Sequence, residues 1–347
     1  MRILSAFLAC SLLAVPLSAA RIELVAGGSE PRVDIPATQA KLTMPFGVDF
    51  DATGGIYIVE FGPGARLLRI DTKGVMQHLA GQPTVGDSGD DGPAATAQFN
   101  GPHNLSVLPS GDVLIGDTWN GRVRRFDPAS GRITAVPGYA VPAAQARASG
   151  PYCITPDTTG TQLYIANLKQ VLRLDLKTGQ TTVIAGNGKK GMPADGARAI
   201  DAPLVDPRAV APDRHGNVYI LERGGHALRV VTPDGCIRTV VNVSGKKGAA
   251  GDEGDARQAT LNGPKHLCID RDDNVIIADT ENHLIRRYEP ATGKIVRLAG
   301  SGKKGPAGLG GDPLACELYQ PHGVALDRDG QLYIADSSNH RVLKIVR

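Results

Sequence analysis

The chain has 347 residues, of which 41% are hydrophobic and only 4% aromatic, and it contains 43 glycines and 24 prolines. A chain of this length can bury a substantial core, and its wealth of turn-forming residues favours many short strands over helices. The formal net charge of +3 excludes the strongly basic surface that attracts nucleic acid or an anionic membrane, so we expect neither as a partner.

Residues 1–20 have the features of a secretory signal peptide. Arg2 provides the positive charge, residues 3–15 are mainly apolar, and small residues precede Arg21. The apolar run is too short to span a bilayer. We therefore expect a secreted or periplasmic protein without a membrane span, in which residues 21–347 form a single domain.

The rest of the chain is an internal repeat. A proline followed by an apolar strand recurs at intervals of 57, 49, 56, 57 and 57 residues, at Pro45, Pro102, Pro151, Pro207, Pro264 and Pro321. In the last unit, apolar segments at 323–326, 332–335 and 341–346 are separated by polar turns, and earlier units add a fourth segment such as 295–300. Six units of four short strands predict an all-β, six-bladed β-propeller.

The last unit ends at Arg347 after its third strand. The segment 21–27 resembles the fourth strands of other units, such as 183–186 and 297–300. We therefore expect residues 21–27 to complete the last blade, because ring closure protects a sheet edge that would otherwise be open.

The turns between the second and third strands carry a recognisable signature. One reads Asn282-His283-Leu284, and the turns at 339–341 and 120–122 are variants of it. The connector at 89–99 adds a Gly-Asp-Asp-Gly-Pro-Ala-Ala-Thr pattern. Residues 21–347 therefore resemble NHL-repeat proteins, and the connectors are similar to those of bacterial NHL proteins and teneurins. The resemblance implies the propeller but no single activity, because such folds carry unrelated functions.

Two positions recur in these turns. His226, His283 and His340 are 57 residues apart, and an acidic residue such as Asp279 ends the second strand of most blades. We expect both to bind backbone N–H groups of their own turn, which is a structural role.

The residue after each repeat proline varies from blade to blade. It opens the innermost strand and so lies at the mouth of the central channel, where the series reads Phe46, His103, Tyr152, Arg208, Lys265 and His322. The next residue inward includes Asn104 and His266. A position with a purely structural role would repeat one residue type. This mixture therefore indicates a candidate ligand site, and the alternative is that the polar groups only hydrate the channel.

Two chemistries fit these residues. His103, His322 and His266 could share a metal ion such as zinc or calcium. Arg208, Lys265 and His266 could instead hold a carboxylate or another anion, with Tyr152 as a proton donor. The Pro-His pairs at 102–103 and 321–322 also resemble peptidyl-hydroxyglycine amidating lyase, which implies a zinc-dependent lyase, although Phe46 stands where a further ligand would be needed.

The connectors hold one more pattern. Gly-Lys-Lys-Gly occurs at 188–191, 245–248 and 302–305, and Lys189, Lys246 and Lys303 would form an arc that attracts an anionic glycan or an acidic protein face. The alternative is that these lysines are simply solvated. Trp119, in a blade 2 turn, would suit stacking on a sugar or packing against a neighbouring loop.

The even repeat, the lysine arc and the lack of a complete catalytic motif favour a monomeric binding scaffold. Its ligand would be a protein, peptide or glycan that binds at the connectors. The alternative is an enzyme with its site in the channel, a metal-assisted lyase or hydrolase acting on a small anionic substrate.

Overall fold

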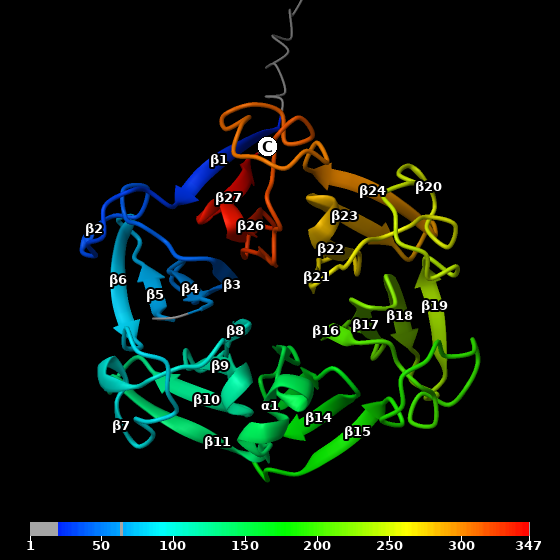
Figure 1. Ribbon diagram of the computed structural model, residues 1–347, viewed down its shortest axis with the longest axis horizontal. Coiled ribbons are helices and arrows are strands. Elements are labelled where there is room, and N and C mark those ends of the chain that lie inside the picture. Colours follow the sequence, from blue (N-terminus) through cyan, green and yellow to red (C-terminus); the bar gives the residue numbers. More distant parts are fainter. Residues whose placement is uncertain (1–19, 63–64, 347) are drawn as a thin grey trace, which may run out of the picture.

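The computed structural model describes residues 20–62 and 65–346, so the expected signal peptide lies outside the described residues except for Ala20. Six antiparallel sheets are arranged radially around a central axis (Figure 1). The predicted all-β, six-bladed propeller is therefore confirmed. We label the four strands of each blade a to d, from the innermost strand to the outermost.

The strands of the six blades have the following bounds. Blade 1 contains β3 (Pro45–Phe50), β4 (Ile56–Glu60), β5 (Leu67–Ile70) and β6 (Val75–Ala80). Blade 2 contains β8 (Asn104–Val107), β9 (Val113–Asp117), β10 (Arg122–Asp127) and β11 (Arg132–Ala140). Blade 3 contains β12 (Cys153–Pro156), β13 (Gln162–Ala166), β14 (Val171–Asp175) and β15 (Thr181–Ala185). Blade 4 contains β16 (Pro207–Pro212), β17 (Val218–Glu222), β18 (Ala227–Val231) and β19 (Ile237–Val241). Blade 5 contains β21 (His266–Ile269), β22 (Val275–Asp279), β23 (Leu284–Glu289) and β24 (Lys294–Ala299). Blade 6 contains β25 (Gly323–Leu326), β26 (Leu332–Asp336), β27 (Arg341–Val346) and β1 (Arg21–Ala26).

The remaining elements are short. The seven-residue helix α1 (Ala143–Ser149) lies between blades 2 and 3. Single 3₁₀ turns occur at η1 (Ala94–Thr96), η2 (Thr118–Asn120), η3 (Thr280–Asn282) and η4 (Ser337–Asn339). Within the described ranges, none of the helices has the length and apolar character that a membrane crossing requires.

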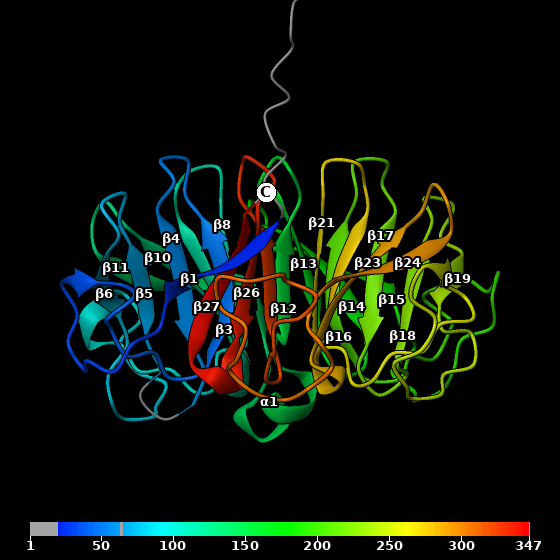
Figure 2. The ribbon, with the colours of Figure 1, turned by 90° about the horizontal axis from the view of Figure 1, so that it is seen from above.

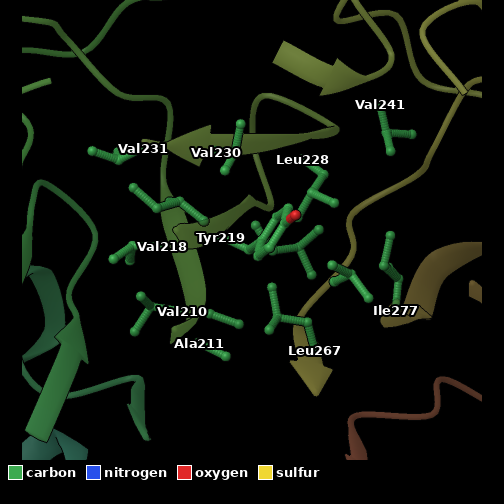
Figure 3. Packing of buried hydrophobic residues seen from close by; sticks show 14 of the residues in the cluster. Val210, Ala211, Val218, Tyr219, Leu228, Val230, Val231, Val241, Leu267 and Ile277 are labelled. Carbon is green, nitrogen blue, oxygen red and sulfur yellow. The ribbon is translucent and has the colours of Figure 1, made fainter. Parts of the chain in front are cut away.

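The core lies between neighbouring blades, because each sheet packs its apolar side chains against the next. Figure 3 shows this packing where Val210 and Tyr219 of blade 4 share a buried cluster with Leu267 and Ile277 of blade 5. Strand b is buried along almost its whole length in five blades, as its run of β-branched and apolar residues predicts, whereas in blade 3 Gln162 and Tyr164 are only partly buried.

The ring closes as predicted. Strand β1 pairs antiparallel with β27, with Arg21 opposite Val346, so the first described strand becomes strand d of the last blade. The Ile22 side chain is 0% exposed in the cluster between blades 5 and 6.

The connectors between blades cover the outer strands. In five blades the preceding connector runs along strand d and donates one backbone N–H to a carbonyl oxygen near the start of that strand, at 2.7–2.8 Å. The donor and acceptor pairs are Asp34 and Met76, Asp91 and Ile133, Gly196 and Ile237, Glu253 and Ile295, and Gly310 and Ile22. In three blades this contact forms a fifth strand, at β2 (Ile35–Pro36), β7 (Gly92–Pro93) and β20 (Gly254–Asp255).

The turn residues hold more distant partners than expected. Nδ1 of His226, His283 and His340 accepts a backbone N–H from the connector that leads into the next blade, at 3.0–3.1 Å. The Asp279 carboxylate accepts the N–H of Asn262, seventeen residues earlier, and the Asn282 amide. The expectation that both positions bind only their own turn was therefore wrong, because the connectors pass directly over these turns.

Candidate functional site

Strand a begins, strand b ends and the connectors run on one face of the propeller, which we call the connector face. Helix α1 lies on this face, whereas the chain ends on the opposite one (Figure 2). The mouth residues predicted from the repeat open strand a here, so they surround the same end of the central axis.

A polar crossbar lies just inside the mouth. The amide nitrogen of Asn104 in blade 2 lies 2.9 Å from Nε2 of His266 in blade 5, the blade opposite in the ring. The Asn104 amide oxygen accepts the N–H of Ile154, and Nδ1 of His266 accepts the N–H of Val324 at 3.3 Å. The crossbar joins four blades across the axis, so the mouth ends in a polar floor.

Aromatic rings form one wall of the mouth. The ring of Phe46 stacks on Phe61 at 4.3 Å between centroids and on His322 at 3.9 Å. His103 meets the edge of the Tyr152 ring at 4.6 Å. Trp119 lies against Phe61 and His103, so its indole packs on neighbouring mouth residues and remains only partly exposed.

His322 has unused hydrogen-bonding capacity. Its side chain is only 2% exposed, and neither ring nitrogen has a hydrogen-bond partner among the described residues. Burial, with the nearby His103, Lys265 and Arg208 as further causes, holds the pKa of His322 well below the usual value, so the ring is neutral near pH 7. A buried polar group without a partner is costly, and a ligand that pairs with it would remove that cost.

His103 is held in place by one of its two nitrogens. Nδ1 lies 2.8 Å from the carbonyl oxygen of Gly101, which makes it the protonated nitrogen and leaves Nε2 as an acceptor. Burial and the Arg208 charge lower the pKa of His103 well below its usual value. The His103 and His322 ring centroids lie 5.8 Å apart.

Cations stand beside the aromatic wall. The Arg208 guanidinium lies 4.0 Å above the Tyr152 ring, is 9% exposed, and has no partner for Nε among the described residues. Burial lowers the pKa of Arg208 to about 10, so it stays charged at neutral pH. Lys265 pairs with Glu281 at 3.0 Å, and the Tyr152 hydroxyl donates to the Arg147 carbonyl at 2.6 Å. Tyr152 is therefore already engaged as a donor.

The charges at the mouth do not balance. Among the described residues, four cations have two carboxylates as ion-pair partners: Arg208 and Arg223 share Asp206, and Lys265 pairs with Glu281, whereas Arg147 lies over Trp119. Asp206 is shared, with Arg223 at 2.6 Å and Arg208 at 4.0 Å. The surplus of positive charge favours an anionic group on a ligand.

Phe61 and Arg223 are mouth residues that the sequence reasoning missed. Both directly follow the acidic residue that ends strand b, where other blades have Thr118, Thr280 and Ser337. Those three hydroxyls donate to a proline carbonyl of the next blade at 2.6–2.9 Å. A break in the Thr/Ser pattern at this position was therefore the available signal.

The lysine arc lies in ordered connectors. Lys190, Lys247 and Lys304 form single parallel bridges with Leu204, Leu261 and Leu318, and the predicted Lys189, Lys246 and Lys303 precede them. All six side chains are exposed. The arc therefore has a fixed backbone and exposed side chains, of which that of Lys304 lies over the Tyr319 ring at 4.1 Å.

The three candidate metal-binding histidines occupy different levels. His103 and His322 lie at the mouth, whereas His266 belongs to the crossbar below, where its Nε2 lies 2.9 Å from the Asn104 amide nitrogen. Over residues 20–62 and 65–346, no group of three or more His, Cys, Asp or Glu side chains is placed to hold a metal ion. Zinc sites use at least three protein ligands, so the shared metal ion remains a prediction from the sequence.

Family profiles match much of the chain. The profile of the teneurin NHL domain matches residues 85–250, and that of the NHL repeat matches residues 261–288 and 318–345. Human teneurin-1 is 23% identical over 83% of this chain, and the chicken NHL repeat-containing protein 2 is 24% identical over 87%. Protein SUPPRESSOR OF QUENCHING 1 of Arabidopsis thaliana is 23% identical over 74%. The chain spans 11%, 46% and 26% of these relatives, respectively.

Solved structures share the fold. An auxiliary nutrient binding protein from Bacteroides thetaiotaomicron superposes with a TM-score of 0.68 at 16% identity, covering 94% of this chain and 76% of that one. Virginiamycin B lyase from Staphylococcus aureus superposes with a TM-score of 0.56 at 14% identity, covering 94% and 99%. At these identities the likeness extends to the fold alone.

Proposed function

The chain belongs to the NHL-repeat β-propeller proteins, and from that premise we propose that it is an extracytoplasmic binding propeller. Its ligand would carry a carboxylate or another anionic group beside a flat apolar group, as a peptide or a modified sugar does. The ligand would bind at the channel mouth on the connector face. The export part of this proposal rests on the signal-like segment 1–20.

One observation carries the proposal. The buried nitrogens of His322 and Nε of Arg208 have no hydrogen-bond partner among the described residues, and they lie beside the aromatic wall of the mouth. Arg208 would bind the anionic group of the ligand, and the neutral His322 would add one hydrogen bond as donor or acceptor. A planar apolar group would lie against the aromatic wall. The likeness to a nutrient binding protein is consistent with such capture.

The test is a binding screen with matched ligand pairs. Peptides that end in an aromatic residue would be titrated by calorimetry, each as the free carboxylate and as the amide. We expect only the carboxylate to bind, with at least a tenfold loss in Arg208→Gln and a smaller loss in Arg208→Lys. Arg125→Gln, at an exposed arginine of β10, serves as the control. Equal binding of acid and amide, or full binding by Arg208→Gln, would refute the proposed site.

The lysine arc is tested separately, because a large acidic partner could bind there without using the mouth. A variant with Lys189, Lys246 and Lys303 changed to Glu should bind the small ligand with an affinity within about twofold of the parent, because salt screens exposed charges that do not contact the ligand. If instead it loses the small ligand while Arg208→Gln keeps it, the connectors are the binding site.

A channel-site enzyme is the second candidate, and the two neutral histidines at the mouth favour it. A neutral imidazole can accept a proton from a bound substrate, and both rings face the same mouth. Metal analysis of the purified protein separates the metal-dependent form from the binding proposal. Stoichiometric zinc that disappears in His103→Ala/His322→Ala would support the metal-dependent enzyme. Metal-free protein whose melting temperature does not change on adding divalent ions would contradict that form of the enzyme.

A further inference from the structure

Blade 3 differs from the other five blades at its outer edge. Its preceding connector forms α1 on the connector face and does not run along strand d, so none of the described strands pairs with the outer edge of β15 (Figure 1). The end of β11 touches only the start of this edge, where the Thr181 hydroxyl donates to the Gly138 carbonyl at 2.7 Å. In the other blades a residue at the start of strand d, the first or the second of the strand, accepts a backbone hydrogen bond from the connector. No described residue makes that bond to β15.

The register identifies which backbone groups are left open. Thr181 lies opposite Leu174, as Ile295 lies opposite Tyr288 in blade 5 and Ile237 opposite Val231 in blade 4. Thr181 therefore occupies the position whose carbonyl accepts the connector N–H elsewhere. The five equivalent side chains, Ile22, Met76, Ile133, Ile237 and Ile295, are all 0% exposed, whereas Thr181 is exposed.

A second open position follows two residues later. Val183 corresponds to Thr239 of blade 4, whose N–H donates to the Asp195 carboxylate and whose carbonyl accepts from Arg257. No described residue makes either bond to Val183, and its side chain is 36% exposed. An open strand edge with an exposed apolar side chain can add a further strand.

The covering segments in the other blades show what such a strand resembles. The donating residue is acidic in three blades and glycine in two, and its φ is positive, between 58° and 88°, in all five cases. Where the donor is glycine, an aspartate is near: Asp195 directly precedes Gly196, and Asp312 lies two residues after Gly310. The natural occupant of this edge is thus a short, acidic, glycine-containing segment.

The charges around β15 fit the same occupant. Arg173 lies directly across from Thr182, and Lys177 lies in the turn that leads into β15. Both are exposed and neither forms an ion pair among the described residues. The equivalent Arg69, Arg125 and Arg287 of other blades pair with Asp51, Asp112 and Glu289. Asp175, the nearest acidic residue, is already bonded to Lys177 N–H, Thr178 and Gln162.

From these observations we propose that the β15 edge binds an extended acidic peptide segment of a partner protein, which adds a fifth strand to blade 3. The partner backbone pairs with Thr181 and Val183, and its carboxylates face Arg173 and Lys177. A second copy of this chain fits less well, because pairing two β15 edges would bring the same positive charges together.

The probe is a fluorescent synthetic peptide with the sequence of residues 249–258, the connector that covers blade 5. Anisotropy titration at low salt should show saturable binding, and replacing its three acidic residues by their amides should weaken it at least tenfold. The protein variant Arg173→Glu/Lys177→Glu should show a similar loss without changing the β15 backbone. Lys41→Glu/Lys73→Glu, with the same charge change in blade 1, serves as the control.

Hydrogen exchange locates the binding. The amides of Thr181 and Val183 should exchange rapidly in the free protein and at least tenfold more slowly with the peptide. No binding at millimolar peptide, or binding without protection of these amides, would overturn the proposal. So would a dimer in sedimentation experiments whose Val183 amide is protected without peptide, because the edge would then be occupied by a second copy.

Discussion

Ile22→Ala tests whether ring closure contributes as much to stability as the covalently continuous blades do. Ile22 is fully buried between blades 5 and 6, and its backbone exchanges hydrogen bonds with Gly310 and Gly311. Truncating a buried isoleucine to alanine costs about 2–5 kcal/mol, because transfer free energy is lost and a cavity is left. We expect a cost of about 3.5 kcal/mol, in the middle of that range.

The same cost can be expressed as a melting temperature. Unfolding entropy is about 2.1 cal/mol/K per residue, so a propeller of about 325 residues has roughly 0.7 kcal/mol/K. A loss of about 3.5 kcal/mol then lowers Tm by about 5 °C. Urea unfolding monitored by circular dichroism gives the free energy directly, provided that it is reversible and its slope is unchanged.

Two comparison variants make the result interpretable. Ile295→Ala removes the equivalent buried side chain from blade 5, where strand d is covalently continuous with strand c, and it should cost the same. Glu23→Ala changes a partly exposed neighbour on β1 and should stay within about 0.5 kcal/mol of the parent. If Ile22→Ala costs less than about 1 kcal/mol while Ile295→Ala costs the full amount, the closing strand detaches before the ring unfolds and the reasoning fails.

Three further outcomes are expected. Burial lowers the pKa of His266 from 6.5 to about 4, so between these values the unfolded chain binds a proton that the folded protein does not. The folded state therefore loses stability as the pH falls from 6.5 toward 4. Between pH 6.5 and 4.5 the parent should lose about 2 kcal/mol more than His266→Gln in urea unfolding, and equal losses would contradict the assigned burial. Gly323→Ala should destabilise by more than about 2 kcal/mol, because the added methyl collides with a neighbouring carbonyl oxygen, whereas Gly311→Ala has room; thermal melts that rank them in reverse would disprove the packing. His283 has a φ of 57°. His283→Ala should lower the free energy of unfolding by about 2 kcal/mol, and His283→Asn by only about 1 kcal/mol, because asparagine tolerates the left-handed backbone. Equal free energies of unfolding for the two variants in urea would exclude backbone strain.

The sequence alone determined the architecture, because each blade repeats one local pattern. The 57-residue spacing, the apolar strands and the polar turns are properties of contiguous segments, so they can be read without knowing what packs against them. Even the closing strand was visible, since residues 21–27 resemble other fourth strands. The residues that open strand a were also placed at the mouth in advance, because position in a blade maps directly onto position in the ring, whereas Phe61 and Arg223 were missed.

The tertiary structure decided which of these residues share an environment. Asn104 and His266 are 162 residues apart and meet only because their blades lie opposite each other. Within the described part of the chain, the ring nitrogens of His322 have no partner, which its sequence neighbours do not indicate. The route of the connectors was likewise hidden, because hydrogen bonds from loops to distant turns leave no periodic signal. That route shields five outer strands and leaves β15 open, a difference of tertiary contacts that no single segment encodes.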